Sequence, residues 1–281
     1  MNWRVPRLKV RRETLLFLIC LLIAMIATFA TLNTTMNVTS LSESIAIEAA
    51  ERMPRWFFTD VKVIWNGDSP EETFSGSLQF VHGDRINVER ISTGPLRVTV
   101  SRMDDNSGKT GDAFSPNELF LRSFGSGTVI RIDNLEGMAK NGQNVVLAFS
   151  GTVTPASNVQ GVPSMTAPVL KAGTIQILGH SIMSESLYRG ESVPLGLGDN
   201  VVIEEPVGPA IGFVVADETA GLNLTYRQLA SRARVVHLPA NGYIVDLSVA
   251  DRLKNDRTLQ LLWLATGFLW AIPKAWKDKR E

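Results

Sequence analysis

The feature that most constrains this chain is a run of 19 uncharged residues near its N-terminus, residues 14–32. As an α-helix at about 1.5 Å per residue, this run would measure roughly 28 Å, close to the ~30 Å hydrocarbon core of a bilayer. It is longer than the apolar region of a cleaved signal peptide, which usually has about 7–15 residues. Residues 1–13 carry a net charge of +4, and basic flanks of this kind stay on the cytoplasmic side. The sequence therefore predicts a cytoplasmic N-terminus followed by an uncleaved transmembrane helix over 14–32.

A second uncharged run lies near the other end, over residues 258–273. Residues 274–281 follow it with a net charge of +2, and the tryptophans in and after the run are of the type that gathers at membrane interfaces. A buried helix and a helix lying in the membrane interface are the alternatives. The flanking charges favour a second transmembrane helix over 258–273 with a cytoplasmic tail over 274–281.

The zero net charge of the chain, 28 basic against 28 acidic residues, is a sum of unequal parts. With both ends positive, residues 14–273 carry a net charge of −6. This partition predicts a bacterial inner-membrane protein with both termini in the cytoplasm and an acidic central domain in the periplasm. The neutral balance gives no general reason to expect nucleic-acid binding, which needs a concentrated basic face. The single cysteine, Cys20, lies within the first run and excludes an internal disulfide and a cysteine-based zinc site.

Helices are expected on either side of the exported region. The Ser40-x-x-Glu43 spacing resembles a capping box, and the Ala- and Glu-rich residues after it predict a stalk helix over 38–53 that Pro54 ends. A matching helix over 250–257 is expected to lead into the second run. A short helix is also expected over 224–234, where apolar residues recur at helical spacing.

Between the stalks the sequence is typical of a mainly β protein. Apolar and polar residues alternate over 96–101, as they do in a half-buried strand, and turn residues separate many short segments of this kind. We therefore expect an exported β-sandwich or barrel-like fold, with β-rich subdomains over 55–153 and 169–250. Residues 154–168 contain three prolines and no charge, which indicates a linker between the subdomains or a long loop within one domain. The strands are expected at 61–65, 77–82, 86–91, 96–101, 128–133, 145–153, 174–178, 201–204, 211–216, 235–238 and 243–249.

Two segments resemble ligand-binding loops, but each lacks a residue that the loop requires at a fixed position. Ser107-Gly108-Lys109-Thr110 looks like the end of a phosphate-binding loop, but the glycine required five positions before the Gly-Lys pair is replaced by Met103. Asp104, Asp105 and Asn106 suggest a calcium loop, but the twelfth position, which needs a bidentate Glu, is Ser115. Both patterns are better interpreted as a solvated hairpin turn.

The sequence contains the residue types of a hydrolase triad, but the sequence motif that marks the nucleophile is incomplete. Ser181 lies in Gly179-His180-Ser181-Ile182-Met183, where Met183 replaces the second glycine of a nucleophile elbow. A triad of Ser181, His237 and Asp246 would require the fold to bring these residues together. His82, His180 and His237 are too far apart in sequence to predict a zinc site. We assign no catalytic, metal-binding or cofactor-binding residue from the sequence.

These observations favour a non-enzymatic, membrane-anchored envelope protein whose periplasmic β-domain acts as a scaffold or assembly subunit of a larger membrane complex. Its expected partners are the lipid bilayer and other envelope or membrane proteins. One alternative is a membrane-anchored envelope hydrolase that uses the triad of Ser181. Another is an accessory subunit of a transporter or channel, in which the small residues Thr266-Gly267 would pack against another helix.

Overall fold

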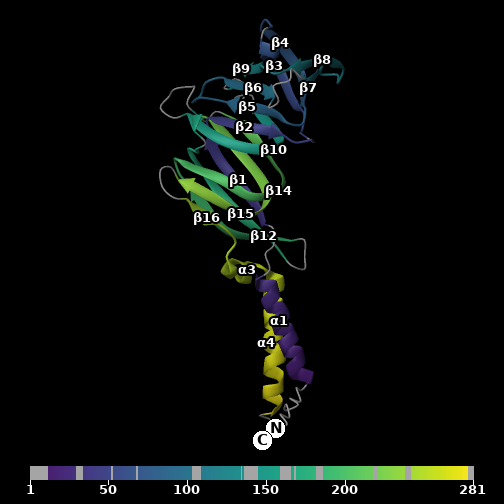
Figure 1. Cartoon of the computed structure of the whole chain (residues 1–281), viewed down its shortest axis with the longest axis vertical. Helices are drawn as coiled ribbons and strands as arrows, with labels where there is room; N and C mark the ends of the chain where they lie inside the picture. Colours follow the sequence, from purple (N-terminus) through teal and green to yellow (C-terminus); the bar gives the residue numbers. More distant parts are fainter. Residues whose placement is uncertain are drawn as a thin grey trace, which may run out of the picture. The chain divides into compact units, whose positions relative to one another are not determined.

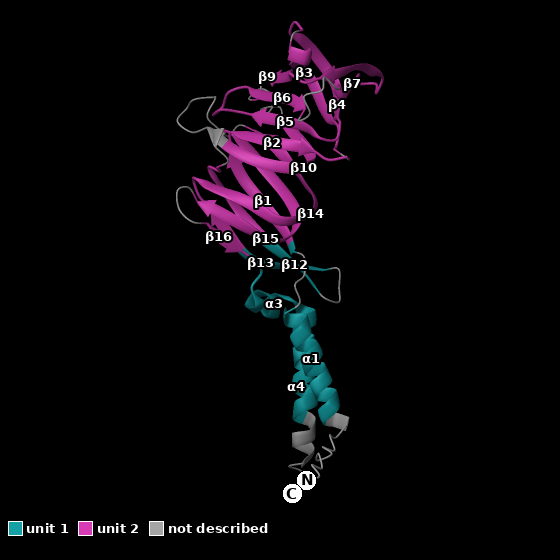
Figure 2. Ribbon diagram, in the orientation of Figure 1, with its two compact units in different colours: residues 1–34, 177–191, 246–281 teal, residues 35–176, 192–245 magenta. Residues whose placement is uncertain are grey.

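The chain divides into two compact units, coloured separately in Figure 2. Unit 1 comprises residues 1–34, 177–191 and 246–281, and unit 2 comprises residues 35–176 and 192–245. The computed structural model describes side chains over most of this chain, and only the backbone of residues 12–13, 157–158, 166–167 and 272–277. The described residues are 12–29, 34–51, 53–67, 69–102, 109–133, 135, 145–158, 166–167, 169–181, 186–217, 220–237 and 242–277.

Unit 1 contains the helices α1 (Arg12–Phe29), α3 (Val249–Asn255) and α4 (Arg257–Lys277). The helix expected over 250–257 is confirmed as α3, and α4 begins almost at once after it. Counted over the residues that the structure describes, none of these helices is long and apolar enough to cross a membrane.

The fold is mainly β, as expected, and is built on one large antiparallel sheet (Figure 1). Along the sheet the strands follow the order β13-β12-β1-β15-β14-β10-β2-β5-β6-β9-β3-β4-β7-β8, while β11 pairs with β10 and β16 with β15. A 3₁₀ turn, η1 (Trp65–Gly67), follows β3. The strands are β1 (Thr34–Ser42), β2 (Ser44–Ala49), β3 (Trp56–Ile64), β4 (Glu72–Phe80), β5 (Asp84–Glu89), β6 (Leu96–Arg102), β7 (Lys109–Phe114), β8 (Phe120–Gly125), β9 (Thr128–Ile132), β10 (Val145–Asn158), β11 (Thr166–Ala167), β12 (Ala172–His180), β13 (Leu187–Leu195), β14 (Asp199–Ala216), β15 (Leu222–His237) and β16 (Tyr243–Val245).

The stalk helix predicted over 38–53 is wrong, because these residues form β1 and β2. Ile45 and Ile47 are both fully buried, and this period of two places them on one face of β2. Glu43 does not act in a capping box. Its Oε1 accepts a 2.6 Å hydrogen bond from Lys171 Nζ. Burial against the sheet therefore outweighs the helix propensity of the alanines and glutamates in this segment.

The short helix predicted over 224–234 is wrong for the same reason. These residues lie within β15, which pairs with β14 along almost its whole length, for example Phe213 with Thr225. Leu222, Leu224 and Tyr226 alternate toward the interior, so the apolar spacing belongs to a strand.

Strands from both of the predicted β subdomains pair with one another. Residues 145–151 of β10 pair with β14, and residues 151–156 of the same strand pair with β2. At Gly151, where the two pairings meet, a Cβ atom would lie 1.9 Å from the carbonyl oxygen of Glu48, so only glycine fits. The predicted linker thus begins as regular strand over 154–158, while residues 159–165 and 168 lie outside the described part.

Arg90 is a fully buried cation that joins two turns of unit 2. It follows β5, and its guanidinium donates to the carbonyl oxygens of Gly94 (3.2 Å), Asp217 (2.6 Å) and Gly221 (3.2 Å). These carbonyls belong to the β5–β6 connection and to the segment between β14 and β15. Hydrogen bonds from a charged donor to buried carbonyls are worth about 1.5–3 kcal/mol each, so Arg90 fixes the two turns to each other.

Asp84 is a buried carboxylate at the start of β5. Its Oδ2 accepts a 2.8 Å hydrogen bond from the backbone N–H of Val81, whereas Oδ1 is buried and has no hydrogen-bond partner among the described residues. Burial raises the pKa of this carboxyl from 3.8 to about 6, although the Val81 N–H and Arg102 favour the ionised form.

We predict that Asp84 makes the stability of the protein depend on pH. Because its pKa is higher in the folded state, its contribution favours folding at low pH and is lost as the pH rises from about 4 to about 6. Asn cannot ionise, so the Asp84→Asn variant does not lose this stability as the pH rises. The free energy of unfolding of Asp84→Asn, relative to the unsubstituted chain, should therefore rise by about 2–3 kcal/mol between about pH 4 and pH 7.5. Urea unfolding of the full chain at several pH values measures this difference, and a difference that stays constant with pH would contradict the prediction.

Candidate functional site

The helix pair of α1 and α4 in unit 1 has a small, closely packed interface and a large apolar exterior. Ala24 and Thr28 of α1 and Leu259 and Thr266 of α4 are buried, and the alanine and the threonines are small enough to let two helices approach closely. The outward side chains on α1 are large and apolar and are 46–65% exposed. The exposed apolar residues of the pair are Leu15, Leu16, Leu18, Ile19, Leu22, Ile23, Met25, Ile26 and Phe29 on α1, and Leu261, Leu264, Phe268, Leu269 and Trp270 on α4.

The polar side chains inside the pair satisfy one another or the backbone. The hydroxyl of Thr28 donates to the carbonyl oxygen of Ala24 (2.7 Å) and accepts from the indole N–H of Trp263 (3.1 Å). The hydroxyl of Thr266 donates to the carbonyl oxygen of Leu262 (2.8 Å). The contact between Trp263 and Thr28 is thus a hydrogen bond between the two helices. Internal pairing of this kind is what an environment without water requires.

Asp256 joins α3 to α4. Its backbone N–H donates to the carbonyl oxygen of Arg252 (2.9 Å) and so ends α3. Its side-chain Oδ1 accepts from the backbone N–H groups of Thr258 (2.9 Å) and Leu259 (3.3 Å), which are free at the start of α4. One residue therefore caps the end of one helix and the beginning of the next.

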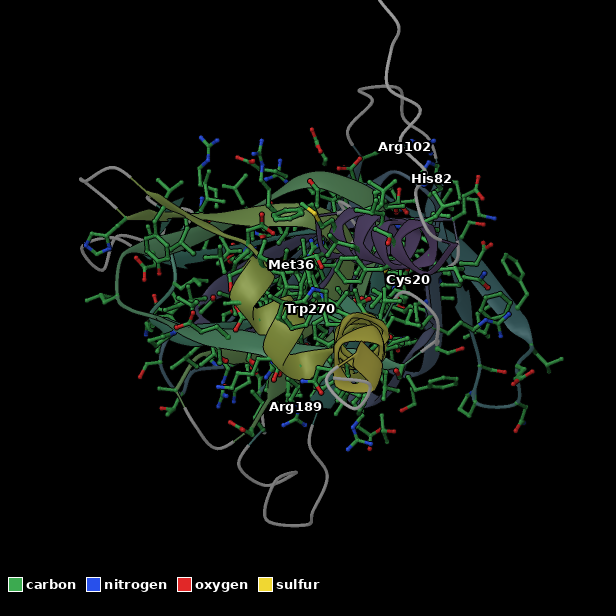
Figure 3. All side chains as sticks on the ribbon, turned by 90° about the horizontal axis from the view of Figure 1, so that it is seen from below. Cys20, Met36, His82, Arg102, Arg189 and Trp270 are labelled. Carbon is green, nitrogen blue, oxygen red and sulfur yellow. The ribbon has the colours of Figure 1, made fainter. Side chains whose placement is uncertain are left out.

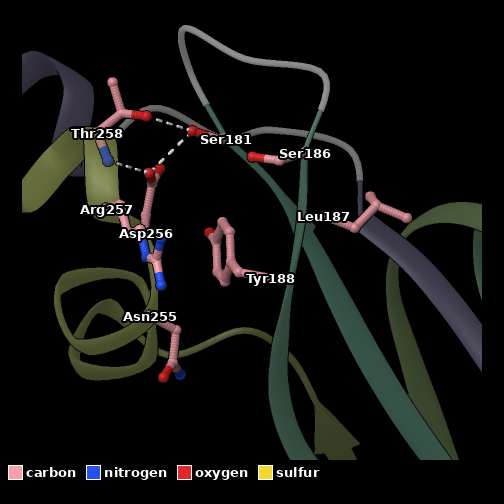
Figure 4. Close-up of a pocket in the computed structure, with 8 residues that line it drawn as sticks. All are labelled: Ser181, Ser186, Leu187, Tyr188, Asn255, Asp256, Arg257 and Thr258. Carbon is pink, nitrogen blue, oxygen red and sulfur yellow. Dashed lines mark hydrogen bonds between the residues drawn. The ribbon is translucent and has the colours of Figure 1, made fainter.

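The polar cavity of unit 1 lies beside this joint and has a volume of about 380 Å³ (Figure 4). Its lining residues come from the ends of β12 and β13 and from the joint between α3 and α4: Ser181, Ser186, Leu187, Tyr188, Asn255, Asp256, Arg257 and Thr258. Ser181 connects the two groups, because its hydroxyl contacts Asp256 Oδ1 at 2.9 Å and the hydroxyl of Thr258 at 2.7 Å. Both the carboxylate and the hydroxyls are thus fixed by hydrogen bonds within unit 1.

Gly179 makes room for the tyrosine ring of this cavity. A Cβ atom at Gly179 would lie 2.3–2.5 Å from atoms of the Tyr188 ring, including its hydroxyl oxygen, so a larger residue would displace the ring. Partial burial raises the pKa of Tyr188, which therefore keeps its proton at neutral pH. The glycine that suggested a nucleophile elbow thus has a packing role next to Tyr188.

The three residues of the predicted triad each have other partners. Ser181 contacts Asp256 and Thr258, as described above. His237 Nδ1 lies 2.7 Å from Asp199 Oδ1, and Asp246 Oδ1 accepts from the N–H of Leu247. Among the described residues no hydrogen bond joins Ser181, His237 and Asp246 to one another. Sequence reasoning selected Ser181 and missed Asp256, for which the only signal was an acidic residue just before an apolar helix.

The other candidates from the sequence are placed separately. His82 Nδ1 lies 3.1 Å from the carbonyl oxygen of Ala49, and His180 is the last residue of β12. Cys20 is half-buried on α1, and Figure 3 shows it and Trp270 of α4 in a view along the two helices. Lys109 and Thr110 begin β7, while residues 103–108, with the rest of the phosphate-loop and calcium-loop patterns, lie outside the described part. In the part of the chain that is described, no three His, Cys, Asp or Glu side chains form a metal-binding group.

The arrangement is suited to packing and binding. The helix pair offers an apolar exterior, and the cavity beside it offers one carboxylate, one guanidinium, several hydroxyls and an aromatic ring. No protein-family model, curated protein or solved structure matches the chain.

We predict that the Trp263–Thr28 hydrogen bond stabilises the helix pair. Thr28→Val removes the acceptor with little change in shape, and Trp263→Phe removes the donor together with part of the ring. In a double-mutant cycle the two substitutions should show a coupling of about 1 kcal/mol, the usual net contribution of a protein hydrogen bond. Unfolding of the full chain in detergent provides the measurement. Additive effects of the two substitutions would mean that the hydrogen bond does not contribute.

Proposed function

We propose that this protein is a membrane-anchored bacterial envelope protein that presents its β-rich unit in the periplasm as a scaffold or assembly subunit of a membrane complex. The observation that carries the proposal is the exterior of the helix pair, where fourteen large apolar side chains are exposed among those that the structure describes on α1 and α4. Exposed apolar patches on soluble monomers rarely exceed a few hundred Å², and larger ones mark contact sites for membranes or other proteins, which supports the proposal.

The interior of the helix pair supports the same proposal. Soluble helices commonly expose a polar face, whereas here the hydroxyls of Thr28 and Thr266 and the indole of Trp263 face protein acceptors. The uncharged run of the sequence also extends beyond the last described residue of α1, to Leu32. The bilayer is the environment in which an apolar exterior and internally satisfied polar groups are both favourable.

The charge pattern supports an orientation. Basic residues outnumber acidic ones before the first run and after the second, and residues between the outer segments are net acidic. By the positive-inside rule, both termini would be cytoplasmic and unit 2 would be exported. A scaffold role is consistent with a sheet that has exposed apolar residues at its β8 edge, such as Leu119, Phe120 and Leu121.

Anchoring is tested by placing a charge on the outside of α1. Leu22 is 59% exposed, and Leu22→Arg should raise the free energy of membrane insertion by about 2–3 kcal/mol, the cost of arginine in a bilayer centre. The fraction of protein that resists alkaline carbonate extraction should fall accordingly.

The matched control for this substitution is Leu119→Arg. Leu119 is 67% exposed but lies in unit 2, so its replacement should leave extraction unchanged. Extraction of the unsubstituted chain by carbonate would overturn the anchoring proposal. Reporter fusions at both termini test the orientation, and an exported C-terminus would contradict it.

The scaffold role predicts defined protein partners for unit 2. Photo-crosslinking groups placed at Phe57 and Phe120, which are 73% and 58% exposed, should give discrete crosslinked species in intact membranes at native expression. The same group at Arg85, an exposed position on β5, serves as a comparison. A chain that gives only uncrosslinked monomer at all three positions would contradict the scaffold proposal.

A further inference from the structure

The polar cavity of unit 1 lies where the uncharged part of α4 begins. Arg257 is the first residue of α4, and residues 258–273 that follow carry no charge. If the helix pair is a membrane anchor, as proposed above, the start of this uncharged run is at the level of the lipid headgroups. The inference below rests on that anchoring.

The cavity contains a carboxylate with an oxygen still available. Asp256 is only 2% exposed, and its Oδ1 accepts all three of the side-chain hydrogen bonds described above. Within the described residues Oδ2 accepts none, and it is not among the buried atoms that lack a partner. A nearly buried carboxylate that lines a cavity favours a cationic group there.

Tyr188 supplies an aromatic ring next to this carboxylate. Figure 4 shows the side chain extending from β13 toward the segment that carries Asp256 and Arg257, with its hydroxyl at the leading end. The ring lies against Gly179, where any side chain would overlap it. A carboxylate and an aromatic ring on one cavity are the two groups that recognise an ammonium ion.

Arg257 supplies the opposite charge at the same cavity. Its exposed guanidinium is suited to phosphate, which it can bind through two parallel hydrogen bonds. The lining thus contains one anionic and one cationic side chain, which match a ligand that carries one ammonium and one phosphate. A purely anionic ligand would be repelled by Asp256. The volume of about 380 Å³ lies at the small end of ligand sites and suits a headgroup.

We propose that this cavity binds the headgroup of a zwitterionic aminophospholipid, with the ammonium between Asp256 and Tyr188 and the phosphate at Arg257. The same chemistry is present in the free headgroup, so a soluble headgroup is expected to bind more weakly at the same residues. The site would fix the depth of the helix pair at the membrane surface.

The test uses the full chain in detergent micelles, with bound lipid counted by native mass spectrometry. Phosphatidylethanolamine should be retained about tenfold more strongly than phosphatidylglycerol, which has a phosphate but no ammonium. Glycerophosphoethanolamine should displace it, and inorganic phosphate at the same concentration should not. Equal retention of the two lipids, or displacement by phosphate alone, would show an anion site or unspecific lipid and would overturn the proposal.

Three substitutions assign the binding to the cavity. Asp256→Asn keeps an oxygen that caps α4 and removes the charge, and Tyr188→Leu removes the ring, so both should abolish the tenfold preference. Arg257→Gln should weaken both lipids. Lys254→Gln, on α3 outside the cavity lining, is the control and should retain the preference.

The outcomes separate this inference from the anchoring proposal. Circular dichroism checks that Asp256→Asn is folded. If this variant is unfolded, the lipid preference of Tyr188→Leu tests the proposal instead. A chain that resists carbonate extraction but shows no preference, or whose variants keep the preference, overturns lipid recognition and leaves the anchor intact. A chain that carbonate extracts overturns both.

Discussion

The pairing of β10 on both of its sides is the constraint on which the rest of unit 2 depends. Its first half is hydrogen-bonded to β14 and its second half to β2, so this strand links the early strands of the chain to the late ones. Backbone groups taken out of water must find partners, and in this unit the sheet supplies nearly all of them. Gly151 permits the close approach at which the two pairings meet. Segments that join this sheet become strands even where their composition favours helix.

Side chains with polar groups reinforce the sheet where turns approach one another. Arg90 donates only to backbone carbonyls in the contacts described, so it holds two connections that have no regular pairing of their own. Trp56 is almost fully buried, and its indole N–H donates to the carbonyl oxygen of Ala148 on β10 at 2.6 Å. Its ring packs on Phe80 with centroids 4.8 Å apart. Each of these groups combines apolar burial with a hydrogen bond to the backbone.

The sequence was informative where one strong local pattern agreed with the final packing. The alternation over 96–101 predicts β6 because its apolar residues are the buried ones. It misled at Ile45 and Ile47, since the neighbouring Ala46 and Glu48 have high helix propensity and only contact with distant strands decides the outcome. For the candidate site, Ser181 was singled out for a motif it does not complete. Asp256 belongs to no motif, and its partner Ser181 lies 75 positions away, so only the fold reveals their contact.

The joint at Asp256 has a mechanical consequence for unit 1. Three contacts restrain this residue. Its backbone N–H makes the last hydrogen bond of α3, and its Oδ1 caps the start of α4. The same oxygen accepts a hydrogen bond from Ser181, which follows β12. A rotation of α4 about its axis would therefore apply torque to α3 and to the end of β12 through a single side chain. Because hydrogen bonds weaken steeply outside a narrow range of distance and angle, such a rotation breaks these contacts together instead of stretching them gradually. Asp256 thus couples the orientation of α4 to that of α3 and of the end of β12, and this coupling is lost in one step when its hydrogen bonds break.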